Sequence, residues 1–263
     1  MTESVFDQIV LSAKALKIDL SSEEIAALVQ KENMSEQSIT DISTVFRYLE
    51  QKHKDAVIEG CLTFSRLPRK DPKTFDNFDF SRIHGKDVEA LKNIPTLSAL
   101  YARKNMAFIG PQGVGKTHLA MAFGRAVCEM GMKSYFLKAT ELNQKLTNAR
   151  KFDKVASVTT GLVKPSCLII DEIGRCVFDE VNTQIFFDII DRRSNKEGPN
   201  CMIFTSNKNP STWGKHFIEQ DSLLCALDRF FDDSTVFVIK GESYRGRKTE
   251  TISLEAGTNK SLK

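Results

Sequence analysis

Asn105-Met-Ala-Phe-Ile-Gly-Pro-Gln-Gly-Val-Gly-Lys-Thr117 is the stretch of this sequence that decides the fold. The apolar run at 106–109 predicts a short buried strand, and the residues after Lys116 predict an amphipathic helix whose apolar face begins at Leu119. Between the two stands the pattern Gly110-x-x-x-x-Gly-Lys-Thr117. A loop of this composition between a strand and a helix is typical of a phosphate-binding loop. The sequence therefore predicts nucleotide binding, and the alternative interpretation is a glycine-rich turn without a ligand.

The residue types in this loop suit the chemistry of a bound phosphate. Glycines let the backbone turn so that successive N–H groups point at one anion, and the amino end of the following helix adds the positive end of its dipole. Lys116 is expected between the β- and γ-phosphates of ATP, and the Thr117 hydroxyl is expected to hold Mg²⁺. The residues predicted to bind the nucleotide are Gly110, Pro111, Gln112, Gly113, Val114, Gly115, Lys116, Thr117 and His118.

Composition is ordinary for a globular protein. The 263 residues allow one large domain with a small appendage, and 41% of them are hydrophobic and 27% charged. The net charge of +3 is too small to identify a nucleic-acid partner. The six cysteines form no C-x-x-C pair and no zinc spacing, so buried reduced thiols are expected. The sequence shows no signal peptide and no apolar run of about 18 residues, so we expect a cytoplasmic protein with no membrane partner.

After the loop, apolar runs that predict strands alternate with helical patterns. Strands are predicted at 106–109, 134–137, 167–170, 201–204 and 235–239, with helices at 140–150, 179–193 and 222–231. The run at 167–170 has no polar interruption, as expected when both faces of a sheet are covered. This alternation predicts an α/β fold, a doubly wound parallel sheet with helices on both faces and a ligand at the carboxyl ends of the strands.

Four segments are predicted along the chain. Residues 1–65 show helical periodicity and a capping box at Ser21 to Glu24, which predicts a small N-terminal helical domain. Residues 66–104 are expected to form a linker and a lead-in helix at Val88–Arg103, residues 105–250 the nucleotide-binding domain, and 251–263 a polar tail. The helical domain either packs on the main domain or docks DNA or a protein, and the sequence leaves both possibilities open.

The linker combines positive charge with aromatic residues. Arg66, Arg69, Lys70 and Lys73 cluster around two prolines, and three phenylalanines follow within 75–80. We expect the phenylalanines to pack on the nucleotide-binding domain. The basic stretch is either a solvated surface or a contact with DNA phosphates.

An acid pair ends the strand predicted at 167–170. In Leu168-Ile-Ile-Asp171-Glu172, Asp171 is placed to hold the Mg²⁺ that bridges the phosphates. Glu172 is placed to orient and deprotonate a water molecule. Such a pair favours hydrolysis of ATP over transfer of phosphate to a metabolite. The alternative is a charged strand end that faces solvent.

Three further polar residues are candidates for the site. Asn207 ends the next strand pattern, which would place its amide beside the γ-phosphate, although an Asn at a strand end is also a common turn residue. Arg229, on an exposed predicted helix, suits an arginine finger that reaches a neighbouring subunit. Arg245, just past the last strand, suits a contact with the nucleotide of its own chain. The alternative for both arginines is a solvated surface position.

Taken together, these motifs resemble the IstB family of insertion-sequence helper ATPases, which belongs to the AAA+ ATPases and is similar to DnaC-type helicase loaders. The resemblance covers roughly residues 75–248. Besides the phosphate loop and the acid pair, it rests on Asn77-Phe-Asp-Phe80, Thr205-Ser-Asn207, Trp213-Gly214, Leu227-Asp-Arg229 and Lys240-Gly-Glu-Ser-Tyr-Arg245. The chain departs from the family pattern at Arg175, where a bulky apolar or aromatic residue is expected.

The resemblance implies Mg²⁺-dependent ATP hydrolysis by homo-oligomers, ring-shaped or helical, that assemble on duplex DNA and help a partner transposase to engage its target. It assigns Lys116 and Thr117 to phosphate and magnesium, and Asp171 and Glu172 to metal and water. It further assigns Asn207 to sensing, Arg229 to the finger that acts in trans, and Arg245 to a second sensor.

Three other functions remain compatible in part with the motifs. A loader of the replicative helicase would share the ATPase core and would prefer single-stranded DNA. A small-molecule kinase would need an acceptor pocket and an arginine-rich lid, which the sequence does not show. A nucleotide-gated binding module that hardly turns over would carry the same motifs, because intact motifs do not fix a rate.

Overall fold

A computed structural model describes residues 4–85, 87–218, 227, 229–241 and 243 of the chain. Its centre is a parallel sheet in which the described strands follow the order β2-β3-β4-β1-β5. The strands are β1 (Asn105–Ile109), β2 (Ser134–Lys138), β3 (Cys167–Asp171), β4 (Cys201–Ser206) and β5 (Ser234–Val238). Each begins and ends within two residues of its predicted bounds. The predicted α/β fold with a doubly wound parallel sheet is therefore confirmed.

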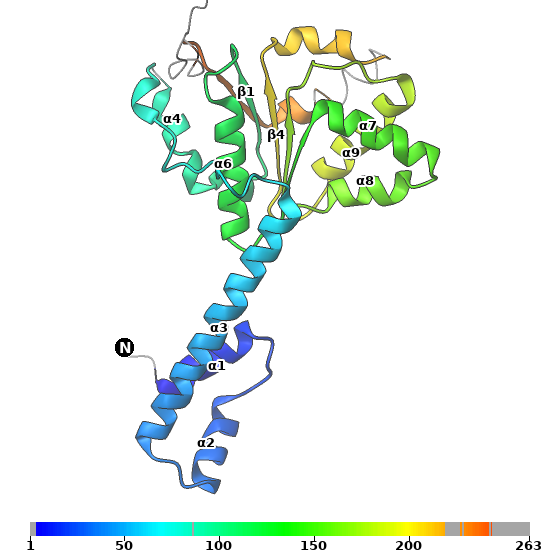
Figure 1. Ribbon diagram of the computed structural model, residues 1–263. Coiled ribbons are helices and arrows are strands. Elements are labelled where there is room, and N and C mark those ends of the chain that lie inside the picture. Colours follow the sequence, from blue (N-terminus) through cyan, green and yellow to red (C-terminus); the bar gives the residue numbers. More distant parts are fainter. Residues whose placement is uncertain (1–3, 86, 219–226, 228, 242, 244–263) are drawn as a thin grey trace, which may run out of the picture.

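Helices cover both faces of the sheet (Figure 1). On one side lies α6 (Lys116–Glu129), and on the other lie α7 (Ala139–Lys151), α8 (Val155–Val163) and α9 (Glu180–Ser194). Side chains of β3 alternate between the two apolar cores, since Leu168 and Ile170 belong to the core on the α7–α9 side and Cys167 and Ile169 to the core on the α6 side. This alternation is why the strand tolerates no polar residue before its carboxyl end.

The lead-in segment differs from its prediction. The single helix predicted over Val88–Arg103 is wrong, because the segment forms α4 (Val88–Lys92), a 3₁₀ turn (Ile94–Thr96) and α5 (Ser98–Tyr101). Pro95 has no N–H to donate and its ring would clash with the carbonyl one turn earlier in a continuous helix. Leu97 then takes a left-handed φ of 56°, which redirects the chain toward β1.

Two further helical segments lie in the predicted nucleotide-binding domain, α8 and residues 227 and 229–232. Helix α8 was not predicted, because Val and Thr have low intrinsic helix propensity, and it is held by packing against α7 and α9. Of the helix predicted at 222–231, residues 227 and 229–231 are helical, and helical backbone continues to residue 232. Residues 222–226 and 228 lie outside the described residues.

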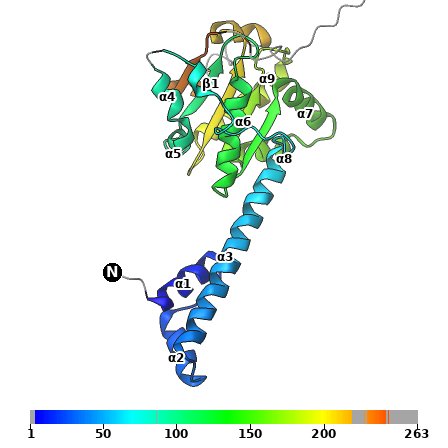
Figure 2. The same ribbon diagram turned by 60° about the vertical axis from the view of Figure 1, so that its left-hand side comes forward.

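The N-terminal residues form three helices, α1 (Val5–Ala15), α2 (Ser22–Lys31) and α3 (Glu36–Ser65). The capping box predicted at the start of α2 is present, with Ser21 and Glu24 bonded to each other's backbone N–H groups. Helix α3 continues past Gly60, and its 30 residues span about 45 Å, so that α1 and α2 lie at its far end from the sheet (Figures 1 and 2). Within the described residues, no helix combines the length and the apolar character that crossing a bilayer requires.

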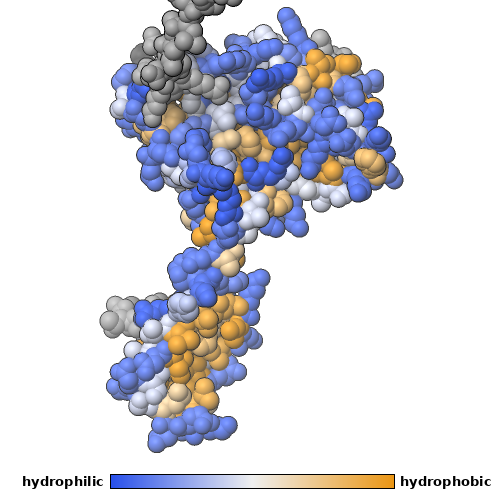
Figure 3. All heavy atoms as spheres, in the orientation of Figure 1, coloured by the Kyte–Doolittle hydropathy of each residue, from blue (hydrophilic) through white to orange (hydrophobic). Residues whose placement is uncertain are grey.

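The far end of α3 carries an apolar surface. Helix α1 packs on α3 through its buried Ile9 and Ala13, and Ser12 Oγ donates to Glu50 Oε2 at 2.7 Å. Many apolar side chains on these helices stay exposed. Figure 3 shows a stripe of hydrophobic residues along the helices on the face in view. The exposed apolar side chains of this part are Val5, Leu11, Ile18, Leu28, Val45, Tyr48 and Leu49.

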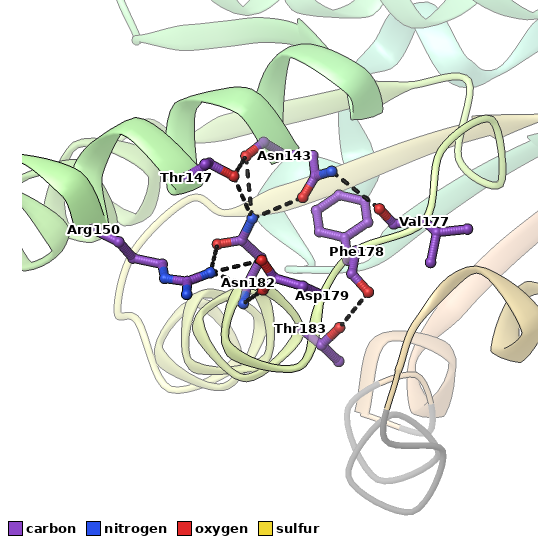
Figure 4. A network of polar contacts seen from close by, with 8 residues as sticks. All are labelled: Asn143, Thr147, Arg150, Val177, Phe178, Asp179, Asn182 and Thr183. Atoms are coloured by element: carbon purple, nitrogen blue, oxygen red, sulfur yellow. Dashed lines mark hydrogen bonds and ion pairs between the residues drawn. The ribbon is translucent and has the colours of Figure 1, made fainter.

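A polar network joins α7 to the start of α9 (Figure 4). Asn182 is 1% exposed, and its Nδ2 donates to Asn143 Oδ1 and Thr147 Oγ1, both at 2.9 Å. Its Oδ1 accepts from Arg150, which also pairs with Asp179 at 2.7 Å. Asp179 caps α9 by accepting from the Asn182 N–H at 2.8 Å. The network therefore fixes the two helices against each other on the side of the sheet that lies opposite α6.

A buried arginine ties together the amino ends of β3 and β4. Arg193 of α9 is 0% exposed, and burial lowers the pKa of its guanidinium to about 10, so it stays charged at neutral pH. The negative end of the α8 dipole contributes acceptors that suit this cation. Its hydrogen-bond acceptors are the carbonyl oxygens of Leu162, Val163, Pro165, Ser166 and Cys201 and the Asn200 Oδ1.

Replacing Arg193 by Met is expected to lower the free energy of unfolding by about 3 kcal/mol, because a group of buried acceptors loses its donor. Urea unfolding followed by circular dichroism measures the change. Arg192→Met is the matched control, since Arg192 is the exposed neighbour whose ion pair with Asp188 contributes little. Equal stability of the two variants would contradict the structural role of Arg193.

Candidate nucleotide-binding site

The phosphate loop runs from the end of β1 to the start of α6. Gly113 and Gly115 have φ of +79° and +97°, a region that residues with a Cβ rarely adopt. A Cβ on Gly115 would also stand 2.6 Å from the Phe78 ring. Helix α6 begins directly after this glycine, at Lys116. The loop therefore needs glycine both for its backbone and for the close approach of the linker.

Lys116 places a cation inside the loop. Its side chain is buried, and Nζ donates to the carbonyl oxygens of Gly110 at 2.8 Å and Pro111 at 2.7 Å. The ammonium group thus lies among the loop residues, at the amino end of α6, where the helix dipole is also positive. Both contributions favour an anion at this position.

Two predicted metal ligands and one unpredicted residue meet beside the loop. Thr117 Oγ1 donates to Asp171 Oδ1 at 2.8 Å, and Thr205 Oγ1 of β4 bonds the same carboxylate oxygen. Burial raises the pKa of Asp171, and the two threonine hydrogen bonds oppose that rise. A hydroxyl and a carboxylate are oxygen ligands of the kind that Mg²⁺ takes together with phosphates, so the pair suits that ion.

Sequence reasoning missed Thr205. Its hydroxyl also accepts the Glu172 N–H at 3.0 Å, and its carbonyl accepts the Ile173 N–H at 2.8 Å. Thr205 therefore positions both acids of the pair. The available sequence signal was a hydroxyl residue directly after the apolar run at 201–204, and the structure shows that this residue is buried.

Glu172 lies at the carboxyl end of the sheet, directly after β3. Its backbone has a left-handed φ of +60°, and its side chain is 32% exposed. One carboxylate oxygen pairs with Arg175, and the other lies 3.8 Å from Lys138 Nζ. The carboxylate is thus next to Asp171 in the chain and within reach of solvent.

Asn207 follows β4 next to the start of the loop. Ser206 is paired with Ile109, and the Gly110 N–H donates to the Ser206 carbonyl at 3.2 Å. Asn207 itself is exposed. The sheet register therefore brings Asn207 close to the phosphate loop, and its sensing role stays a prediction.

Arg229 lies at the opposite end of β1. Its guanidinium pairs with Asp191 of α9, and both side chains are exposed. The neighbouring Phe230 carbonyl accepts from the Asn105 side chain at 3.1 Å, which places this segment at the amino end of β1. Five residues of strand, about 16 Å, separate that end from the loop. Arg229 is therefore not part of the loop site of its own chain, and Arg245 lies outside the described residues.

His118 faces the linker. Its Nε2 is 2.8 Å from the Thr74 carbonyl oxygen, and its ring meets the Phe78 ring edge-on. Burial lowers the pKa of His118. Phe78 is buried and Phe75 and Phe80 are partly buried against the core on the α6 side, which confirms the predicted packing of the linker phenylalanines. A nucleotide contact by His118 stays a prediction.

The strand order, the phosphate loop and the acid pair together define a P-loop domain of the AAA+ type. Two solved structures share the fold. AMPPCP-bound DnaA from Aquifex aeolicus is similar over 66% of this chain and 51% of that chain, with a TM-score of 0.53 and 21% identity. The DnaC helicase loader is similar over 64% of this chain and 97% of that chain, with a TM-score of 0.52 and 18% identity.

The sequence relatives identify the family of P-loop proteins to which this chain belongs. Residues 11–252 match the family of IstB-like ATP-binding proteins, and this chain belongs to that family. The ATP-binding protein of insertion sequence IS5376 from Geobacillus stearothermophilus is 37% identical over 82% of this chain and 86% of its own length. The corresponding protein of IS21 from Pseudomonas aeruginosa is 34% identical over 72% of this chain and 69% of its own length. The family resemblance inferred from the motifs is confirmed, and membership implies nucleotide binding.

Gly115→Ala is expected to weaken ATP binding about tenfold, because a Cβ at this φ strains the backbone and meets Phe78. Calorimetric titration of the protein with ATP measures the affinity. Gly161→Ala is the matched control, since Gly161 lies in α8 with no atom within 4 Å of its added Cβ. Unchanged affinity in Gly115→Ala would contradict this account of the loop.

Proposed function

We propose that this protein is an ATP-hydrolysing helper of transposition. It assembles as a homo-oligomer on duplex DNA in the cytoplasm, hydrolyses ATP with Mg²⁺, and assists a partner transposase with its target DNA. The observation that carries the catalytic part is the 2.8 Å contact between Thr117 of the loop and Asp171, with Glu172 as the next residue. Membership of a family of insertion-sequence ATP-binding proteins supports the transposition part.

In this proposal each residue of the site has a distinct role, which its position supports. The loop N–H groups and Lys116 bind the β- and γ-phosphates, and Asn207 reports the state of the γ-phosphate. Mg²⁺, held by Thr117 and Asp171, would supply positive charge to the phosphate oxygens. Glu172 orients a water molecule and accepts its proton as the water oxygen attacks the γ-phosphorus and the bond to the ADP oxygen breaks.

The DNA contact is proposed for the basic linker and its surroundings. Arg66, Arg69 and Lys73 pair with Glu141, Glu59 and Asp71 respectively. Exposed ion pairs of this kind contribute about 0–1 kcal/mol, so DNA phosphates can replace the acidic partners. Arg66 also lines a hollow of about 750 Å³ beside α7, together with Lys145 and Lys154. In an oligomer each subunit would present this basic surface to the same duplex, so that many weak phosphate contacts add up to a higher overall affinity for DNA.

The test is ATP turnover by the purified protein alone, with duplex DNA and with single-stranded DNA. Duplex DNA is expected to give the strongest stimulation. Glu172→Gln is expected to lower kcat about 100-fold while ATP still binds, because it removes the base and keeps the loop. Stimulation by single strands alone would contradict the transposition helper and favour a helicase loader. Undetectable turnover under all conditions would favour a nucleotide-gated binding module.

A second test concerns Arg229 and the oligomer. If Arg229 stabilises the transferring phosphoryl group in the site of a neighbouring subunit, Arg229→Ala lowers kcat about 1000-fold. Mixing this variant with Glu172→Gln then restores part of the turnover, because a mixed interface combines an intact Glu172 with an intact Arg229. Asp191→Ala, which removes only the ion-pair partner, is the control and keeps its activity. An absence of restored turnover in the mixture would contradict the action in trans.

A further inference from the structure

Arg175, a cation at a position where the family resemblance leads us to expect an apolar or aromatic residue, lies next to the proposed base. After β3 the chain makes a tight turn in which the Arg175 N–H donates to the Glu172 carbonyl at 3.2 Å. Gly174 has a φ of +86° and Glu172 a φ of +60°. A left-handed conformation costs a residue with a side chain about 1 kcal/mol, and here the hydrogen bond from Glu172 N–H to Thr205 helps to hold it. The turn brings the Arg175 guanidinium onto Glu172 Oε1.

A second cation, from the neighbouring strand β2, also lies near the Glu172 carboxylate. Glu172 Oε2 lies 3.8 Å from Nζ of Lys138, the last residue of β2. Strand β2 lies on one side of β3, while β4 and β1, which lead to Asn207 and the phosphate loop, lie on the other. One oxygen of the observed carboxylate therefore lies near a cation from β2, the strand on the side of β3 opposite the strands that lead to Asn207 and the loop.

Each carboxylate oxygen of Glu172 thus faces a cation, and one accepts a charge-assisted hydrogen bond from Arg175. A general base needs a free oxygen lone pair directed at the water it deprotonates. We propose that Arg175 is a positioning residue that holds the Glu172 carboxylate in this resting orientation and so slows ATP hydrolysis until stimulation by DNA frees it. The inference rests on the proposed ATPase function.

The solvent exposure of the Arg175–Glu172 ion pair determines how strongly it can slow ATP hydrolysis. Arg175 is 62% exposed and Glu172 32%, so the ion pair has the strength of a surface pair. It therefore slows the reaction by a small factor and does not block it. Because surface ion pairs are screened by salt, the restraint weakens as ionic strength rises.

The experiment measures ATP turnover of the full chain with Mg²⁺, without and with duplex DNA. Arg175→Met is expected to raise kcat in the absence of DNA about two- to fivefold, with an unchanged KM for ATP and a smaller stimulation by DNA. Arg175→Lys, which keeps the charge, is expected to stay nearer the wild-type rate. Added salt raises the unstimulated kcat of the wild type relative to that of Arg175→Met. If Arg175 had only a structural role, the Arg175→Lys variant would not keep an unstimulated kcat near the wild-type value. The unstimulated kcat of the wild type would then also not rise with salt relative to that of Arg175→Met.

Two controls separate this inference from the function on which it rests. Arg192→Met removes an exposed arginine from a comparable ion pair on α9 and should leave kcat unchanged. The double variant Glu172→Gln, Arg175→Met should be as slow as Glu172→Gln alone, because Arg175 acts through Glu172. If Arg175→Met fails to fold, Arg175→Gln replaces it.

Three results would overturn the proposal. An unchanged or lowered unstimulated kcat in the Arg175 variants, with a wild type that is stimulated by DNA, overturns this inference alone. A faster double variant shows that Arg175 does not act through Glu172, and it also overturns this inference alone. A wild type that hydrolyses no ATP with or without DNA overturns the proposed function, and the inference falls with it.

Discussion

The site depends on one buried carboxylate that joins three elements of the domain. Asp171, 2% exposed at the end of β3, accepts from Thr117 on α6 and from Thr205 on β4. These contacts fix the start of α6, and with it the phosphate loop, over the carboxyl edge of the sheet. A buried carboxylate is costly unless it is hydrogen-bonded, so its two hydroxyl partners are part of the requirement. The position of Glu172, the next residue, follows from the same contacts.

The linker adds a second constraint on the loop. Phe78 packs against Gly115 and His118, and Thr74 bonds the His118 ring, so residues 74–80 lie directly against the start of α6. Residues 66–73, with Arg66 on Glu141, lead from there to the end of α3. The N-terminal helices are thus connected to the phosphate loop by a short, packed segment.

Positive side chains lie at two places in the site, inside the phosphate loop and beside Glu172. Lys116 supplies positive charge inside the loop, and Arg175 and Lys138 supply it beside the proposed base. Arg229 lies near the amino end of β1, about the length of that strand from the loop. The predicted phosphate-binding and water-activating residues of the chain therefore lie together at the carboxyl ends of the strands, and Arg229 lies away from them at the opposite end of β1.

The sequence by itself determined the sheet, the loop and the acid pair, because these depend on local patterns. Buried parallel strands need unbroken apolar runs, as in 167–170, and the loop needs glycines at fixed spacing before Lys116. Pro95 broke a predicted helix and α8 formed without a strong helical pattern, since both outcomes depend on local chain geometry or packing that periodicity does not report. Only the tertiary structure placed Thr205 on Asp171 and Arg175 on Glu172 and separated Arg229 from the loop. Strand register brings Thr205 to Asp171 although the two are far apart in sequence. The Arg175–Glu172 contact is local in sequence, but it depends on a tight turn with left-handed backbone that periodicity does not report.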